Sequence, residues 1–335
     1  MNHPSTICGF GSHVPETVVT NDDIAGRHSL TPEWIVSRTG IEARRVAAPG
    51  HTGTDMALAA SLAALQGAGR SAPALTHILY ATCTPDAACP SAACVLAGKL
   101  GLKNRMAVDI NAACAGFLNG LELARALIAL APDACVLLVA SESLSHRCNW
   151  EDPGTAVLFG DGAGAVLVTG PDAATASGSA PAALVTDSLL GTDGGKGGLL
   201  RISGGFSASP YALGDVVGPD YFIRMDGGLV YKHAVRNMTS CCQTLLARNG
   251  LSSADVDLFI PHQANLRIIE AVGKRLGIPQ ERCFLNVHKY GNTSAASIPL
   301  ALDEAIREGT LVAGMRVLLT SFGGGLTWGA ALLQF

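Results

Sequence analysis

The chain has 335 residues, of which 48% are hydrophobic and 15% are charged, and its formal net charge is −4. This length predicts about two domains with large apolar cores. This net charge gives no footprint for nucleic acid, which requires an extended basic face, so no nucleic-acid partner is expected.

The cysteines and the N-terminal segment indicate the cellular compartment. The 10 cysteines are scattered singly, apart from Cys241 and Cys242, and lack the spacing of a zinc site, so we expect reduced thiols and no metal. No signal peptide is apparent, and no apolar run reaches the roughly 18 residues of a membrane span. The sequence therefore predicts a cytoplasmic protein without a membrane segment. Only the stretch from Gly170 to Pro181 is typical of a linker.

Helix and strand patterns alternate along the N-terminal half. The periodicity predicts a helix over 54–66 and strands over 78–81, 106–110 and 136–140. Such alternation is typical of α/β layering, and we expect mostly parallel central strands.

Cys114 lies where the strand over 106–110, expected to be buried, turns into a helix of small residues. The N–H groups and dipole at a helix start lower the pKa of a thiol and favour the nucleophilic thiolate. Its neighbours within 112–116 are all Ala or Gly and leave the sulfur accessible. Cys114 is therefore a candidate nucleophile, although a cysteine taken alone is more often a buried packing residue.

A glycine-rich run from Gly160 to Ala165 loosely fits a dinucleotide-binding fingerprint. It precedes a strand over 166–168, whereas the fingerprint needs a helix whose N-terminus holds the pyrophosphate. We therefore exclude nucleotide binding for this run.

Two later segments supply partners for Cys114. An apolar strand broken by Pro261 delivers His262 into a loop, and Asn292 follows a strand expected over 283–287 and precedes a small-residue helix. Each residue alone is more often structural, as a satisfied histidine or a helix cap. Together they fit a Cys/His/Asn set, although the sequence does not show that the three meet in space.

The chain repeats itself. The segment 159–168 recurs as 322–333, and the helix end 97–102 recurs as 272–278. This order predicts two similar halves, residues 1–172 with the cysteine and 173–335 with the histidine and asparagine. A pseudo-twofold axis would bring the two helix starts face to face.

With the glycine-rich turn over 322–329, these segments resemble the β-ketoacyl-acyl-carrier-protein synthase III enzymes of the thiolase superfamily, and the resemblance runs from Gly9 to Phe335. It implies a thiolase-like α/β fold with stacked helix and sheet layers. It also implies decarboxylative Claisen condensation of an acyl-CoA primer with malonyl-acyl-carrier protein, which initiates fatty acid synthesis. CoA thioester and acyl carrier protein are substrates, and no cofactor is expected.

The resemblance assigns roles to the catalytic residues. Cys114 would attack the acyl-CoA, and the N–H groups of Cys114 and Gly325 would form the oxyanion hole. His262 and Asn292 would hold the enolate formed when malonyl loses carbon dioxide.

It also suggests how the substrates bind. Trp34, Arg38 and Arg267 match positions that contact CoA, although an ordinary amphipathic helix with a packed Trp explains the first two as well. Pro153 and Gly228 depart from the common pattern, in which Arg and Asn would support CoA binding. The basic residues Lys232, Arg267, Lys274 and Arg275 would dock the carrier protein, or would form a merely solvated helix face.

Cys89 matches a position that, in this family, reaches across a homodimer interface and caps the partner's acyl pocket. A bulky Phe is common there in enzymes restricted to short primers. The smaller Cys89 predicts primers longer than acetyl, unless neighbouring side chains fill the gap.

Three other functions remain open. An acyltransferase of the same fold, serving a specialised metabolite pathway, would not need Asn292. A thiolase would need a second cysteine near residues 323–325, where the chain has three glycines. A non-catalytic acyl-CoA sensor or scaffold would need none of the three candidate residues.

Overall fold

The computed structural model describes residues 4–171 and 181–335, so most of the expected linker between Gly170 and Pro181 lies outside the described residues. The strands are β1 (Ser5–His13), β2 (Val18–Thr20), β3 (Ala43–Arg45), β4 (His77–Ala81), β5 (Met106–Ile110), β6 (Cys135–Ser143), β7 (Asp161–Thr169), β8 (Ala183–Thr192), β9 (Leu200–Arg201), β10 (Arg224–Met225), β11 (Leu258–Pro261), β12 (Arg316–Gly323) and β13 (Thr327–Gln334). The helices are α1 (Asn21–Ala25), α2 (Pro32–Thr39), α3 (Gly53–Gly67), α4 (Ala92–Lys99), α5 (Gly116–Leu130), α6 (Pro153–Ala156), α7 (Gly227–Arg248), α8 (Leu266–Leu276), α9 (Val287–Tyr290) and α10 (Ser297–Arg307).

One nine-stranded sheet, in the order β11-β12-β13-β8-β1-β7-β6-β4-β5, forms the centre of the molecule. Parallel pairing is confined to β11–β12, β6–β4 and β4–β5, near the two edges. The prediction of mostly parallel central strands was therefore wrong. Parallel neighbours need a crossover connection, which α4 and α5 provide for β4, β5 and β6. The central strands β13, β8, β1, β7 and β6 pair antiparallel.

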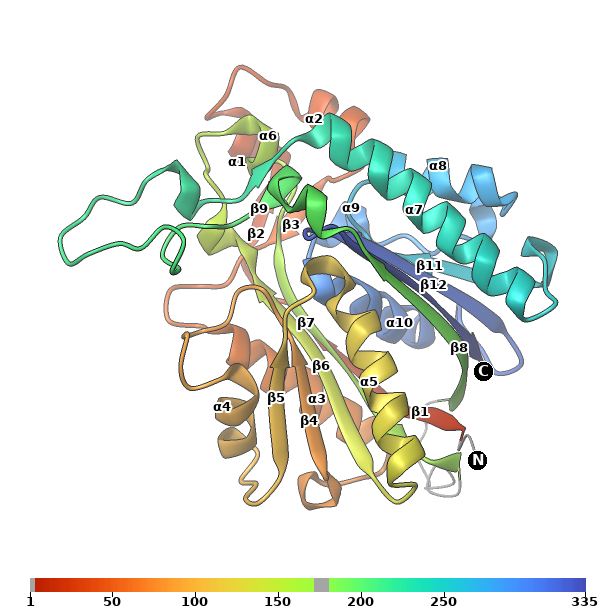
Figure 1. Cartoon of the computed structure of the whole chain (residues 1–335). Coiled ribbons are helices and arrows are strands. Elements are labelled where there is room, and N and C mark those ends of the chain that lie inside the picture. The colour runs from red at the N-terminus through yellow and green to blue at the C-terminus, as the bar shows by residue number, and fades with distance from the viewer. Residues whose placement is uncertain (1–3, 172–180) are drawn as a thin grey trace.

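Helices and sheet are stacked in layers (Figure 1). Helix α3 packs on β1, β6 and β7, while α5 and α10 lie on the opposite side, between the two ends of the sheet. Helix α7 covers β8, β12 and β13 and contacts α8. The α/β layering that the sequence predicts is confirmed.

Small residues allow this close stacking. A Cβ atom at Gly11 on β1 would lie 2.4 Å from the carbonyl oxygen of Ala60 and from the amide nitrogen of Ala64 on α3. Only glycine lets the backbone of the strand approach the helix so closely.

The starts of α5 and α10 face each other in the middle layer. A 3₁₀ turn precedes each helix, Ala113–Ala115 before α5 and Ser294–Ala296 before α10, and the two turns are in contact. Ala113 and Ser294 both have a left-handed backbone, with φ of 44° and 49°. The expected meeting of the two helix starts is therefore present in the fold.

The approach to the second helix start differs from the prediction. Residues 283–287 do not form a strand, because Cys283 makes a single bridge and α9 begins at Val287. The side-chain oxygen of Gln263 accepts hydrogen bonds from the N–H groups of Asn286 and Val287, at 3.0 and 3.2 Å. A side chain thus satisfies backbone groups that a strand would have paired with a neighbour.

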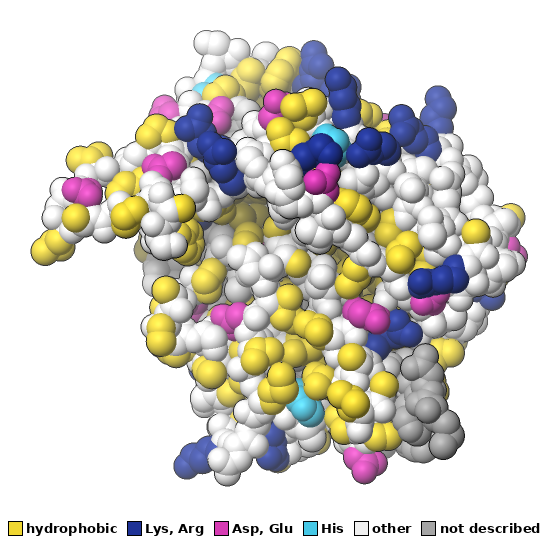
Figure 2. All heavy atoms as spheres, viewed as in Figure 1, with side chains coloured by type: hydrophobic (Ala, Val, Ile, Leu, Met, Phe, Trp, Pro, Cys, Tyr) yellow, Lys and Arg dark blue, Asp and Glu magenta, His cyan; other side chains and the backbone are white. Residues whose placement is uncertain are grey.

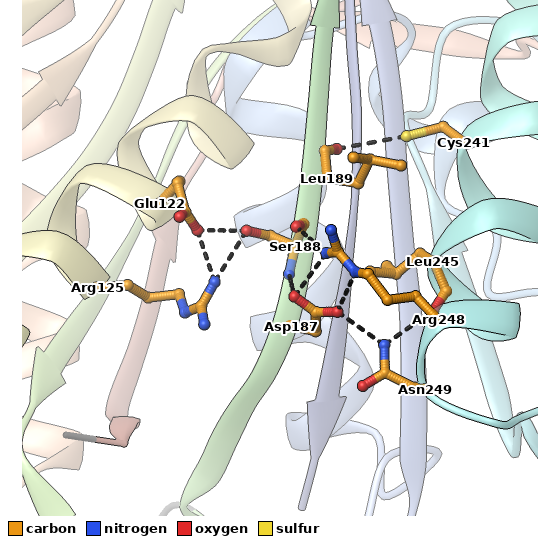
Figure 3. Close-up of polar contacts among 9 residues, drawn as sticks. All are labelled: Glu122, Arg125, Asp187, Ser188, Leu189, Cys241, Leu245, Arg248 and Asn249. Atoms are coloured by element: carbon orange, nitrogen blue, oxygen red, sulfur yellow. Dashed lines mark hydrogen bonds and ion pairs between the residues drawn. The ribbon is translucent and has the colours of Figure 1, made fainter. Parts of the chain in front are cut away.

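A polar network ties α5 to β8 and α7 (Figure 3). Ser188 on β8 donates to Glu122 on α5, and Arg125 donates to both. Asp187 on β8 accepts two hydrogen bonds from Arg248, at 2.7 and 2.6 Å. These bonds link the helix that follows Cys114 to elements of the C-terminal half.

The segment 113–130 is long and apolar enough to cross a membrane, contrary to the expectation that no such run exists. It comprises α5 and the turn before it. Half of it is buried inside the protein, where it packs on β4, β6 and β8, as the core helix of a folded domain does.

Candidate active site

Cys114 lies in the 3₁₀ turn between β5 and α5 and is buried, with 9% of its surface exposed. The Ser321 hydroxyl donates to the Cys114 carbonyl oxygen at 2.7 Å. A Cβ atom at Gly323 would lie 2.6 Å from the Cys114 nitrogen, so this position requires glycine.

The strand before Cys114 is not buried as expected, because β5 forms an edge of the sheet and its Met106 and Val108 are exposed.

The electrostatics of Cys114 also differ from the expectation. Burial raises the pKa of its thiol to about 12, the nearby Ser294 hydroxyl lowers it and the Glu142 carboxylate raises it further. The prediction of a lowered pKa for this thiol was therefore wrong, because removing the thiolate from water raises the pKa by more than the hydrogen bonds from Ser294 and from the backbone of Cys114 lower it.

His262 follows the last residue of β11. Its N–H donates to the Thr320 carbonyl oxygen at 2.8 Å, and its Nδ1 is 2.6 Å from the Ser297 hydroxyl at the start of α10. Burial lowers the pKa of the imidazole to about 3, so the ring is neutral at physiological pH.

Asn292 is fixed by its backbone and by its side chain. Its N–H donates to the Leu158 carbonyl oxygen at 2.8 Å, and its own carbonyl oxygen accepts from Gly160 at 3.1 Å. The side-chain Oδ1 accepts from the Ser294 N–H at 2.9 Å. Because this bond occupies the oxygen of the amide, the NH₂ group remains as the donor.

Two cavities meet at Cys114. The first cavity, of about 470 Å³, is lined by Cys114, His262 and Asn292 together with residues of α7 and α8. The second cavity, of about 410 Å³, is lined by Cys114, Ser294 and Gly325 and by apolar side chains, among them Leu144, Phe159, Leu200 and Ile223. A reagent could thus approach the sulfur from one side while an apolar group occupies the other.

Gly325 lies in the turn between β12 and β13. Its φ of 139° is one that only glycine adopts readily. The next residue of the turn, Leu326, is held by the segment after β8, because Asp193 and Leu326 exchange two backbone hydrogen bonds of 2.9 and 3.0 Å. The backbone of Gly325 therefore faces the second cavity in a fixed conformation.

The residues predicted to bind CoA lie on two helices. Trp34 and Arg38 are on α2, where the Arg38 guanidinium lies 5.8 Å from the Trp34 ring centroid and Trp34 is 42% exposed. Arg267 on α8 lines the first cavity. Asn265 joins the two helices by donating to the Arg38 carbonyl oxygen at 3.1 Å. Pro153 begins the short helix α6, and Gly228 lines the first cavity.

The four basic residues lie on adjacent helices. Lys232 is on α7, whereas Arg267, Lys274 and Arg275 are on α8. Lys232 and Arg267 line the first cavity. Lys and Arg side chains gather along the upper edge of the molecule, over α7 and α8 (Figure 2).

Cys89 lies outside both cavities of its own chain. It is exposed in the loop between β4 and α4, two residues before Ser91, which caps α4.

Three polar residues at the site escaped the sequence analysis. Ser294 and Ser297 lie within the small-residue segment after Asn292, where their hydroxyl groups were the available signal. Glu142 is the last residue but one of the buried strand β6, and it is fully buried. A charged residue that continues an apolar run was the signal for Glu142.

Comparisons with known proteins agree with this geometry. Residues 108–194 match the family model 3-oxoacyl-acyl-carrier-protein synthase III, and residues 246–335 match the model for its C-terminal part. The chain is 58% identical over 335 residues to a β-ketoacyl-acyl-carrier-protein synthase III of Nitratidesulfovibrio vulgaris, with 100% of both chains covered. It is 55% identical over 338 residues to the enzyme of that name from Oleidesulfovibrio alaskensis, again with 100% of both covered.

A solved structure shows the same fold. The crystal structure of 3-oxoacyl-acyl-carrier-protein synthase III from Aquifex aeolicus superposes with a TM-score of 0.87 at 41% identity, and the match covers 99% of this chain and 100% of that one. The thiolase-like fold expected from the resemblance is confirmed.

Proposed function

Because the chain belongs to the 3-oxoacyl-acyl-carrier-protein synthase III family and catalyses the condensation that initiates fatty acid synthesis, we propose that Cys114, His262 and Asn292 carry out this reaction. The observation that carries the proposal is their convergence on the first cavity. The condensation uses an acyl-CoA and malonyl-acyl-carrier protein as substrates and needs no cofactor. The alternative, acyl transfer to a specialised metabolite, is not favoured by these relatives.

In the first half-reaction, the Cys114 sulfur attacks the thioester carbon of the acyl-CoA. The N–H groups of Cys114 and Gly325 hold the oxyanion, and the fixed Gly325 backbone beside the sulfur supports this role. CoA then leaves, and the acyl chain occupies the apolar second cavity.

In the second half-reaction, malonyl on the carrier protein loses carbon dioxide and becomes an enolate. The Asn292 NH₂ group donates to the enolate oxygen, because the Oδ1 atom is already occupied. The Ser297 hydroxyl lies 2.6 Å from Nδ1 of His262, and we assign the hydroxyl as the donor. The neutral ring then carries its proton on Nε2 and donates it to the same oxygen. The carbanion attacks the acyl group on Cys114 and releases the β-ketoacyl product.

The substrates enter past the basic helices. Trp34, Arg38 and Arg267 hold the CoA, since α2 and α8 are joined beside the first cavity. Lys232, Arg267, Lys274 and Arg275 dock the acidic carrier protein, for which the basic residues over α7 and α8 in Figure 2 offer a complementary surface.

The enzyme acts as a homodimer in the cytoplasm, with residues 1–172 and 173–335 as its two similar halves. Strand β5 supports a dimer because, among the described residues, a strand pairs with it on one side only, and because it exposes Met106 and Val108. The segment between β9 and β10 projects from the body (Figure 1), and its Leu213 and Val216 are exposed. We propose that the exposed Cys89 of each chain reaches the second cavity of its partner in this dimer.

The experiment is covalent labelling with radiolabelled acyl-CoA, followed by malonyl-acyl-carrier protein. Cys114→Ser should abolish the acyl-enzyme, because an alkoxide is far harder to form than a thiolate. Cys83→Ser, which changes another cysteine of the second cavity, should keep the label. Undiminished labelling of Cys114→Ser would overturn the assignment.

A further inference from the structure

Arg44, in the short strand β3, is a buried cation that the two half-reactions do not use. None of its surface is exposed. Among the described residues its guanidinium makes hydrogen bonds to neutral oxygens only, and its Nε atom has no partner there. Burying a charge without an opposite charge is costly, so stability alone is a poor explanation for this residue.

The guanidinium of Arg44 joins two separate segments. Its Nη2 donates to the carbonyl oxygen of Val157 at 2.8 Å, in the segment 157–160 between α6 and β7. Its Nη1 donates to Oδ1 of Asn21 at 2.9 Å and to the carbonyl oxygen of Val19 at 3.3 Å. Asn21 is itself fixed, because its Nδ2 donates to the carbonyl oxygen of Ile41 at 2.7 Å. The arginine thus ties the segment 157–160 to a rigid neighbour.

The segment 157–160 is also the one that holds the backbone of Asn292. The Asn292 N–H donates to Leu158 at 2.8 Å, and the Gly160 N–H donates to Asn292 at 3.1 Å. Phe159 and Asn292 accordingly form an isolated parallel bridge. Any shift of this segment would therefore move the asparagine.

The side-chain stem of Arg44 packs against both partners of this bridge. A Cβ atom at Gly160 would lie 3.1 Å from the Arg44 Cβ and 2.3 Å from the carbonyl oxygen of Tyr290. A Cβ atom at Gly291 would lie 3.3 Å from the Arg44 Cβ and 2.7 Å from the carbonyl oxygen of Leu158. The two glycines let the chains on either side of the bridge meet directly over the arginine.

From these contacts we propose that Arg44 is a positioning residue for the second half-reaction. It fixes the segment 157–160 and so directs the Asn292 NH₂ group to the enolate oxygen. A planar guanidinium suits this task, because its fork reaches Asn21 and Val157 at once, whereas an ammonium group does not. Arg44 lines neither of the two cavities and does not touch the substrate.

The inference rests on the proposed role of Asn292, and its test measures the two half-reactions separately. Arg44→Met keeps much of the stem and removes all three hydrogen bonds. Each variant is acylated to completion with radiolabelled acyl-CoA and then given malonyl-acyl-carrier protein. Decarboxylation should be at least about tenfold slower in Arg44→Met, since a displacement of about 1 Å costs up to about 100-fold in rate. Acylation of Cys114, which does not use Asn292, should change far less.

The adjacent arginine provides a matched control. Successive side chains of a strand point to opposite faces, and Arg45 donates to the carbonyl oxygens of Pro15 and Glu16 at 3.2 and 3.3 Å. Arg45→Met should therefore leave both half-reactions near the native rates.

A double variant separates positioning from a general structural role. In an Asn292→Ala background, Arg44→Met should slow decarboxylation little further, because no amide is left to direct. An arginine that merely supports the fold would cost as much in this background as in the native enzyme.

The inference would be overturned by native decarboxylation in Arg44→Met, by an equal loss of both half-reactions, by the same loss in Arg45→Met, or by an undiminished effect in the Asn292→Ala background. If Arg44→Met does not fold, Arg44→Lys decides the outcome. It keeps the charge but cannot bridge Asn21 and Val157, so it should lose decarboxylation selectively, and native rates would then overturn the inference. Native decarboxylation in Asn292→Ala alone would instead refute the proposed role of Asn292 and the inference with it.

Discussion

Asn111 and Asn292 occupy equivalent places at the two helix starts that meet beneath the cavities. In each, the side-chain Oδ1 accepts the backbone N–H two residues on, from Ala113 at 3.3 Å and from Ser294 at 2.9 Å. Each asparagine precedes a left-handed residue and a 3₁₀ turn. By this correspondence Cys114 matches Ala295. The candidate catalytic residue is therefore the fourth residue of this turn in the N-terminal half, Cys114, and the first in the C-terminal half, Asn292.

This correspondence provides a control for the role of Asn292. Asn292→Ala should leave acyl transfer to Cys114 largely intact and slow malonyl decarboxylation by roughly 100-fold, the scale of a lost oxyanion donor. Asn111→Ala removes the matching amide from the other turn and should affect decarboxylation far less. Separate assays of the two half-reactions measure this difference, and an equal loss of both in Asn292→Ala would mean that the residue is structural.

The basic residues on α8 predict a salt-dependent effect. Reversing Lys274 and Arg275 to Glu should raise the apparent KM for malonyl-acyl-carrier protein, more at low salt than at high salt, because screening weakens charge attraction. The acyl-CoA step should hardly change. Steady-state kinetics at graded ionic strength, with Lys103→Glu as a distant charge reversal, checks this. An effect independent of salt would contradict docking on α8.

The size of Cys89 predicts the primer range. The native enzyme should accept primers longer than acetyl, since each extra buried methylene contributes about 0.8 kcal/mol. Cys89→Phe should shift the preference toward acetyl-CoA, and Cys89→Ala should not. Product profiles over acyl-CoAs of graded length measure the shift. Identical two-carbon specificity in the native enzyme and in Cys89→Phe would show that Cys89 does not set the depth of the cavity.

Burial of neutral His262 predicts a loss of stability in acid. Its pKa is about 3 in the folded protein and near 6.5 when exposed, so the unfolded chain binds the extra proton between these values. The free energy of unfolding should therefore fall as the pH drops from 6.5 toward 3. His262→Asn should lose less stability over this range. Denaturant unfolding at several pH values tests the prediction. An equal fall in the free energy of unfolding toward acid pH in both proteins would refute it.

Much of the site could be read from the sequence because its signals are local. A cysteine among small residues, a histidine after Pro261 and an asparagine behind Gly291 each sit at an element boundary that the residue pattern marks. The internal repeat likewise predicts two similar helix starts, since the same turn is encoded twice. These features depend on neighbours in the chain, which the sequence contains in full.

Contacts between distant segments were decided only by the tertiary structure. The thiol of Cys114 has a raised pKa because other elements enclose it, and no nearby residue reveals that burial. The carboxylate of Glu142 meets Ser294 from 152 positions away. The antiparallel centre of the sheet likewise follows from long-range pairing of β1 with β7 and β8. Desolvation and long-range hydrogen bonds depend on the packed arrangement of the whole chain, so the pattern along the sequence determines the candidates and the fold determines their chemistry.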